Sequence, residues 1–89
     1  MVIWESDRDE HLARHGVTIA QANEALYDLD AIVINPDYAA ISGKGVRTIG
    51  YSDSFGDLIT VITVPFEGRT YGATAFPSEG RDRRYYEER

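Results

Sequence analysis

Two histidines, a group of arginines and several tyrosines are the residues of this chain whose types suit chemistry on nucleic acid. RNA cleavage without a metal needs a base for the 2′-hydroxyl, a cation for the phosphorane and an acid for the leaving oxygen. Arginine suits the second task because its planar guanidinium binds phosphate in a bidentate manner. The candidate cations are Arg47 and Arg69 on predicted strands, and Arg81, Arg83 and Arg84 on a predicted helix.

The tyrosines offer a way to hold RNA. Aromatic rings stack on unpaired bases, which is how proteins usually hold single-stranded RNA. The candidates are Tyr51, Tyr71, Tyr85 and Tyr86. The alternative for most of them is ordinary packing in the core and at its rim.

His11 and His15 are the only histidines, and they lie four residues apart. On a helix this spacing places both on one face. They are candidates for a general acid or base, or for a metal pair that would take a third ligand such as Asp7. The alternative is that His15 only ends a helix and His11 lies on the surface.

Other classes of site have no support in the sequence. The chain has no cysteine, which excludes disulfides and Cys-based zinc sites. It has no GxGxxG motif, no phosphate-binding glycine loop and no GxSxG motif. We expect no cofactor and no metal. The acidic N-terminal segment is neither a signal peptide nor a membrane span, so we expect a soluble cytoplasmic protein.

The charge is unevenly distributed along the chain. The 89 residues carry a net charge of −6. Residues 1–40 hold eight acids and two bases and so account for all of it, whereas residues 41–89 hold seven of each. Bulk charge therefore argues against nucleic-acid binding, but four arginines in the last nine residues predict a local basic patch. The alternative is a solvated helix of mixed charge.

These residues need helices and strands to position them. Val2–Trp4 is a short apolar run that predicts an edge strand. A first helix is expected from Asp7, capped by Ser6, to Gly16. A second helix is expected from Thr18, with Gln21 completing a capping box. Its predicted buried stripe is Ile19, Ala22, Leu26 and Leu29.

Strand patterns dominate the second half of the chain. Strands are expected at 31–35, 46–52, 58–66 and 69–76, with a flexible loop at 37–45 and a tight hairpin turn at Glu67–Gly68. A final helix is expected from Pro77–Ser78 to Glu88. The predicted fold class is α+β, a single domain over residues 1–89. It has two N-terminal helices, an antiparallel meander of three to four strands and a C-terminal helix, with the helices on one face of the sheet.

Short motifs in a fixed order resemble the BrnT family of toxins. Ile3-Trp4-Glu5 precedes a helix that ends Arg14-His15-Gly16-Val17, as a W-[DE] pair precedes K-H-G-[VI] in that family. Residues 46–52 are similar to its R-x-x-x-G-x-[ST] strand. Residues 73–88 resemble its S-A-R-x-A-[ST]-x-x-E-R-x-x-Y-E close. The resemblance covers nearly the whole chain.

The resemblance implies a RelE-like fold and a metal-independent endoribonuclease that acts on messenger RNA. It also implies a type II toxin–antitoxin pair, with a DNA-binding antitoxin of the BrnA type as partner. A homodimer is compatible with the sequence. The implied catalytic residues are His15, Arg47, Arg81 and Tyr86. The implied RNA-binding residues are Tyr51, Arg69, Arg83 and Arg84.

One position departs from the family pattern. The family has Arg directly after the S-A pair of the last strand, and this chain has Phe76 after Thr74-Ala75. An apolar ring cannot stabilise a phosphorane, so we expect weakened cleavage, with Arg69 or Arg81 as replacement cations. The alternative function is a catalytically inactive BrnT-like module that acts through protein–protein contacts.

Overall fold

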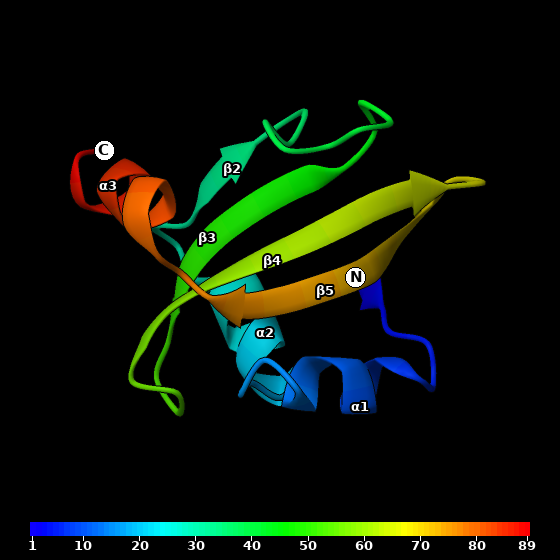
Figure 1. Cartoon of the computed structure of the whole chain (residues 1–89), viewed down its shortest axis with the longest axis horizontal. Coiled ribbons are helices and arrows are strands. Elements are labelled where there is room, and N and C mark those ends of the chain that lie inside the picture. Colours follow the sequence, from blue (N-terminus) through cyan, green and yellow to red (C-terminus); the bar gives the residue numbers. More distant parts are fainter.

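The β-branched runs of the second half form a sheet, and shorter amphipathic segments form three helices on it (Figure 1). The computed structural model describes residues 1–89. In chain order the elements are β1 (Val2–Ile3), α1 (Arg8–Ala13), α2 (Ile19–Tyr27), β2 (Ile32–Ile34), β3 (Val46–Ser52), β4 (Asp57–Phe66), β5 (Arg69–Pro77) and α3 (Gly80–Glu87).

The sheet has five strands in the order β1-β5-β4-β3-β2. Strands β2 to β5 form an antiparallel meander, and β1 pairs with β5 in parallel. The α+β class is confirmed, but the prediction of a sheet of three to four antiparallel strands is corrected to five strands of mixed direction. The fifth strand is the predicted N-terminal edge strand, which follows no hairpin and is therefore free to run parallel to its neighbour.

Local signals fix several boundaries. The Thr18 side chain accepts a hydrogen bond from the Gln21 amide while the Gln21 side chain accepts one from the Thr18 amide, so the predicted capping box is confirmed. Glu67 and Gly68 have φ values of 49° and 79°, as a two-residue hairpin turn requires. The Ser6 cap is wrong: Asp7 occupies the N-cap position of α1, and its carboxylate pairs with Arg8 instead.

One face of the sheet packs against α1 and α2. Its apolar core consists of Leu12, Val17, Ala22, Ala25, Ile59, Val61 and Ala75. Gly50 lets α2 approach β3 closely, because a Cβ atom there would stand 2.0 Å from the Ala25 carbonyl oxygen. Leu29, which the helical spacing predicted to be buried, is fully exposed because α2 ends at Tyr27.

Helix α3 lies on the other face of the sheet, so the prediction that all helices share one face is wrong. The cross-strand register aligns Ile49 with Thr60 and Thr60 with Phe76, which places these side chains on one face. The Thr60 hydroxyl donates to Asp82 of α3, so this is the face that α3 covers. We call it the α3 face. Only Asp82 of α3 is buried, and its partners are polar groups of that face rather than the apolar core.

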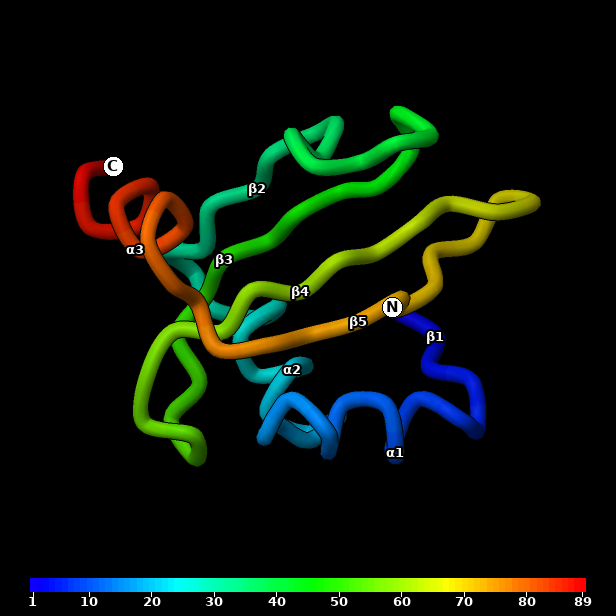
Figure 2. The backbone as a smooth tube through the Cα atoms, in the orientation of Figure 1, coloured from blue at the N-terminus to red at the C-terminus, as the bar shows by residue number.

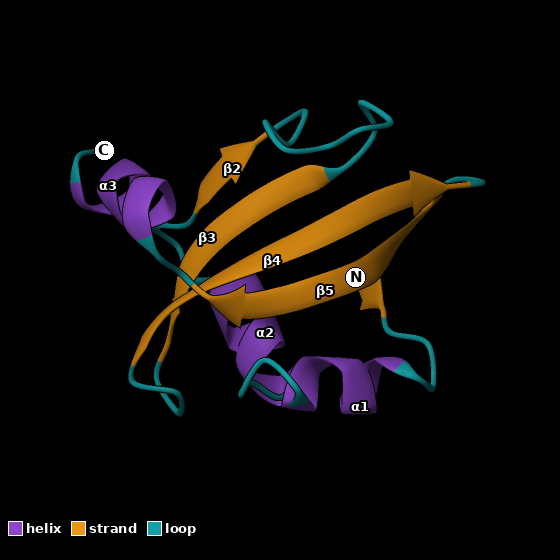
Figure 3. Ribbon diagram, viewed as in Figure 1, coloured by secondary structure: helices purple, strands orange, loops and turns teal.

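The chain termini lie apart in this arrangement. Figure 2 shows the N-terminus beside β5 and the C-terminus beyond α3. Figure 3 shows the helices α1 and α2 along one side of the sheet and α3 at the end remote from the β4–β5 hairpin. No helix combines the length and apolar character that crossing a membrane requires.

Candidate functional site

Arg47 is the centre of the polar cluster on the α3 face. Its Nε atom donates to Asp37 Oδ1 at 2.7 Å, and its Nη1 atom donates to Asp82 Oδ2 at 2.5 Å. Asp37 comes from the loop after β2 and Asp82 comes from α3, so the two ion pairs tie both segments to β3. The Arg47 side chain is 8% exposed. Two carboxylates therefore already neutralise this largely buried guanidinium, which weakens it as a phosphate ligand.

Asp82 has further partners that complete the cluster. It accepts hydrogen bonds from the Tyr38 hydroxyl and from Thr60 Oγ1, the latter at 2.8 Å. Thr60 Oγ1 in turn lies 2.8 Å from the Ser78 hydroxyl. No buried side-chain nitrogen or oxygen in the structure lacks a hydrogen-bond partner. A buried ionic cluster with every member satisfied holds its groups in one arrangement.

The cluster shifts the titration of two of its members. Burial opposes the charged form of Arg47, but its hydrogen bond to Asp37 and the charge of Asp82 outweigh burial and raise its pKa. Burial raises the pKa of the Tyr38 hydroxyl, and its hydrogen bond to Asp82 raises it further. At neutral pH, Arg47 is therefore a cation and Tyr38 a neutral donor.

Tyr38 lies among three other side chains at the surface of the cluster. The Cζ atoms of Arg47 and Arg81 lie 4.2 Å and 4.4 Å from the centre of its ring. The ring centre of Tyr85 lies 6.3 Å away. These distances fit cation–π contacts and offset aromatic packing. Arg81 is thus positioned by an aromatic ring while its guanidinium stays exposed.

Phe76 connects this cluster to the histidines of the first helical segment. Its ring lies 5.8 Å from Arg47 Cζ and meets the His15 ring edge to face at 6.2 Å between centroids. The His15 ring also meets that of His11 at 5.2 Å. His15, at the end of the α1 segment, and Arg47, on the α3 face, therefore contact the same side chain.

His11 sits partly buried where α1 crosses the end of β5. Its Nε2 atom lies 2.9 Å from Thr74 Oγ1. Burial lowers the pKa of His11, and the nearby side chains of Arg8, His15 and Arg14 lower it further. His11 is therefore neutral at pH 7 and able to accept a proton. The structure has no group of three or more side chains placed to hold a metal ion, and Asp7 pairs with Arg8 rather than joining the histidines.

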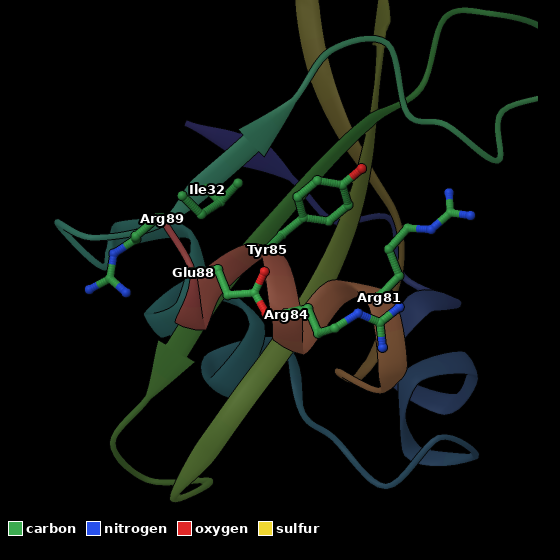
Figure 4. Close-up of a pocket in the computed structure, with 6 residues that line it drawn as sticks. All are labelled: Ile32, Arg81, Arg84, Tyr85, Glu88 and Arg89. Atoms are coloured by element: carbon green, nitrogen blue, oxygen red, sulfur yellow. The ribbon is translucent and has the colours of Figure 1, made fainter.

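Helix α3 and β2 form a groove of about 420 Å³ beside this cluster (Figure 4). We call it the α3 groove. Its lining residues are Ile32, Arg81, Arg84, Tyr85, Glu88 and Arg89. Figure 4 shows the Tyr85 ring between Ile32 and Arg81, with Arg84 and Glu88 below it. Two of the predicted site residues, Arg81 and Arg84, therefore line one concave surface.

The other predicted site residues lie elsewhere. Arg69 is exposed at the start of β5, about 25 Å along the strand from its end near α3. Arg83 pairs with Asp57 at 3.0 Å and with Glu87 at 3.7 Å. Tyr51 lines a separate shallow pocket with residues of α2. Arg69 and Tyr51 are thus outside the site that His15, Phe76 and Arg81 form.

Tyr86 joins α3 to the end of α2. Its hydroxyl donates to Asp28 Oδ2 at 2.6 Å, and Arg89 Cζ lies 4.3 Å from its ring centre. The hydrogen bond to Asp28 raises the pKa of Tyr86 to about 12. A phenol held in this way donates poorly to a leaving group, so this contact favours a role in holding α3 over the implied catalytic role.

Sequence reasoning missed Asp37, Tyr38 and Asp82. Asp82 is 35 residues from Arg47, and no local spacing links the two. Tyr38 stands in a segment that reads as a flexible loop. Only paired substitutions among related chains would have signalled these contacts.

A comparison with protein-family models found no match to this chain, and a search of curated proteins found no significant relative.

Proposed function

We propose that this chain is a toxin-like, metal-independent endoribonuclease with a RelE-like fold, weakened by Phe76. It acts in the cytoplasm and is paired with a DNA-binding antitoxin of the BrnA type. The observation that carries the proposal is the position of Phe76, which contacts His15 on one side and Arg47 on the other. A histidine, an aromatic ring and arginines are groups that metal-free RNA cleavage uses.

The roles follow from exposure and charge. His15 is exposed and serves as the acid or base at the scissile phosphate. His11, held neutral beside it, supplies the complementary proton acceptor. Arg81, on the ring of Tyr38, and Arg14, next to His15 in the chain, are cations without a carboxylate partner. Arg47 is a positioning residue, because Asp37 and Asp82 occupy it and it acts through Tyr38 and Arg81.

Phe76 explains why activity should be low. Its ring occupies the point between His15 and Arg47, where a cation would lie against the developing phosphorane. Removing one preorganised charge donor typically lowers a rate by about 100- to 1000-fold. The natural chain keeps its proton-transfer groups but lacks the charge at their centre.

The test is cleavage of labelled RNA by the purified chain with EDTA present. We expect slow cleavage by the natural chain, about 100-fold faster cleavage by F76R, and loss of cleavage in both backgrounds on H15A. F76M is the matched control, because it keeps an apolar side chain and adds no charge. If neither the natural chain nor F76R cleaves RNA, the proposal fails.

The buried ion pairs favour a second candidate function. Arg47 is paired with both Asp37 and Asp82, as in a structural cluster. A catalytically inactive module that binds its antitoxin would need no free cation there. Under this alternative, F76R leaves RNA intact, while the chain still co-purifies with a co-expressed antitoxin of the BrnA type.

A further inference from the structure

The α3 groove concentrates the unpaired positive charge of an acidic protein. Of the nine lysines and arginines in the chain, Arg8, Arg47, Arg83 and Arg89 each have a carboxylate within 4.0 Å. The other five have none, and of these only Arg81 and Arg84 line a common groove; Arg14, Lys44 and Arg69 line no pocket. The protein as a whole repels anions, so an anionic ligand is directed to this groove.

We propose that the α3 groove binds one unpaired nucleotide of single-stranded RNA, next to the site of cleavage. This inference rests on the proposed function and names the substrate contact outside the reacting groups. Tyr85 is 43% exposed and offers a ring face for the base, with Ile32 as the apolar wall behind it. Arg81 and Arg84 bind the phosphates on either side of that nucleotide.

The groove is connected to the candidate catalytic groups by direct contacts. The ring of Tyr85 packs near the ring of Tyr38. The guanidinium groups of Arg81 and Arg47 both contact the Tyr38 ring. Arg47 in turn lies beside Phe76, which contacts His15. An RNA strand that places one base on Tyr85 therefore runs along the α3 face toward His15.

Glu88 gives the groove a preference among bases. Glu88 is the one carboxylate in a groove with three arginines. A carboxylate repels phosphate, so Glu88 is compatible with nucleotide binding when it contacts the base and not the phosphate. A carboxylate accepts hydrogen bonds and donates none. Guanine presents its N1–H and amino group side by side, whereas the single N–H of uracil is flanked by two carbonyls that repel a carboxylate. The groove is therefore selective for guanine over uracil.

An acidic peptide fits the groove less well than a nucleotide. Glu88 repels a carboxylate, and the Asp and Glu side chains of an acidic peptide have no flat ring to stack on Tyr85. A base on an aromatic ring gains stacking energy whatever its sequence. The groove offers one aromatic face, two free cations and one acceptor, which match the base and the phosphates of one nucleotide.

The test measures binding separately from cleavage. Fluorescein-labelled pentanucleotides UUGUU and UUUUU, with 2′-O-methyl groups to block cleavage, are titrated with the full chain and followed by anisotropy at 50 mM salt. We expect UUGUU to bind about 5-fold more tightly than UUUUU. Y85L should weaken UUGUU binding about 10-fold, and R84A about 5-fold. Y85F should bind as the natural chain does because it retains the ring.

R69A is the matched control. It removes one exposed arginine without a carboxylate partner, as R84A does, but at the other end of β5. We expect less than a 2-fold change. Equal effects of R69A and R84A would show that only net charge matters and would overturn the groove as a binding site. Tighter binding of a polyglutamate peptide than of UUGUU would overturn RNA as the occupant.

The role of Glu88 in the preference for guanine is tested separately. E88Q should abolish the preference for UUGUU, because the amide presents only one acceptor and adds a donor that faces the guanine N–H groups. Equal affinity of the natural chain for both pentanucleotides overturns the assignment of Glu88. Binding through Tyr85 without any cleavage by F76R would retain the groove and refute the nuclease.

Discussion

The rings of His15 and Phe76 meet edge to face, with 6.2 Å between their centroids. This contact places the one exposed acid–base residue of the candidate site against an apolar side chain. In cells, we therefore expect induced expression of the natural chain to arrest growth weakly or not at all. F76R should arrest growth, and F76R combined with H15A should not. Colony counts after induction measure this, and strong arrest by the natural chain would show that another cation, with Arg81 the first candidate, supplies the charge.

The Arg47 ion pairs should dominate the stability of the α3 face. R47A leaves the Asp37 and Asp82 carboxylates buried without their cation, which typically costs about 3–5 kcal/mol. The matched control is R83A, which breaks only partly exposed ion pairs with Asp57 and Glu87 and should cost less than about 1 kcal/mol. Urea unfolding measures both. Equal losses would contradict the buried cluster.

The titration of His11 should appear in the pH dependence of stability. Its folded-state pKa lies below the usual 6.5, so the unfolded chain binds the proton first as the pH falls. The contribution of His11 is therefore complete above pH 6.5 and is lost as the pH falls from 6.5 through the folded-state pKa. H11N can keep a hydrogen bond to Thr74 without titrating, and should flatten this loss. The measurement is the urea midpoint of the natural chain and of H11N at pH 7.5 and at pH 5.5. An equal fall in both chains would contradict the prediction.

Tyr86 should ionise later than an ordinary tyrosine as the pH rises. Its pKa is raised to about 12 by the hydrogen bond to Asp28, whereas an ordinary tyrosine titrates near 10. Because the folded state retains this proton longer, the stabilisation is present below pH 10 and is lost between pH 10 and 12. Absorbance at 295 nm should show a late transition near pH 12 whose amplitude Y86F reduces. Y27F, at an exposed residue, should leave that transition in place.

The two candidate helix caps should differ in their effect on stability. T18A removes a side chain that bonds the Gln21 amide and should cost about 1 kcal/mol. S6A removes a side chain that caps nothing in the structure and should cost less than about 0.5 kcal/mol. Thermal unfolding followed by circular dichroism compares them. A larger effect of S6A would mean that the N-terminus of α1 differs from the structure described.

The close approach of α2 to β3 gives the sharpest steric test. G50A places a methyl group 2.0 Å from a backbone oxygen of α2, so the helix or the strand must move, and the chain should lose several kcal/mol or fail to fold. G45A is the control, because a Cβ atom there meets its nearest neighbour at an ordinary 3.5 Å. Soluble yield and urea unfolding of the two variants provide the comparison.

The elements whose signals are local were predictable from the sequence. β3 occupies residues 46–52 as its β-branched alternation indicated, and Thr18 and Gln21 form the capping box that their spacing indicated. Glu67–Gly68 forms the expected turn. In each case the information lies within a few residues of the structure it determines.

The candidate site depended on contacts that no local pattern carries. Arg47 was identified correctly as a side chain of a strand, but its neutralisation by Asp37 and Asp82 requires the loop after β2 and α3 to meet over one face. Leu29 fits the helical spacing that predicted its burial, but α2 ends at Tyr27 and leaves Leu29 exposed. Arg69 shared a residue type with Arg81, but it lies at the opposite end of β5.

Helix α3 is fastened to the rest of the protein almost entirely by polar groups. Asp82 is its only buried residue, and Arg83 and Tyr86 hold it through Asp57 and Asp28. An element with few apolar contacts can open while the rest of the molecule stays folded. In hydrogen exchange, α3 should therefore behave as a separate cooperative unit from α2. Local unfolding of α3 would move Arg81, Arg84 and Tyr85 away from the sheet together. The surface proposed to bind RNA therefore belongs to the element that we expect to unfold first.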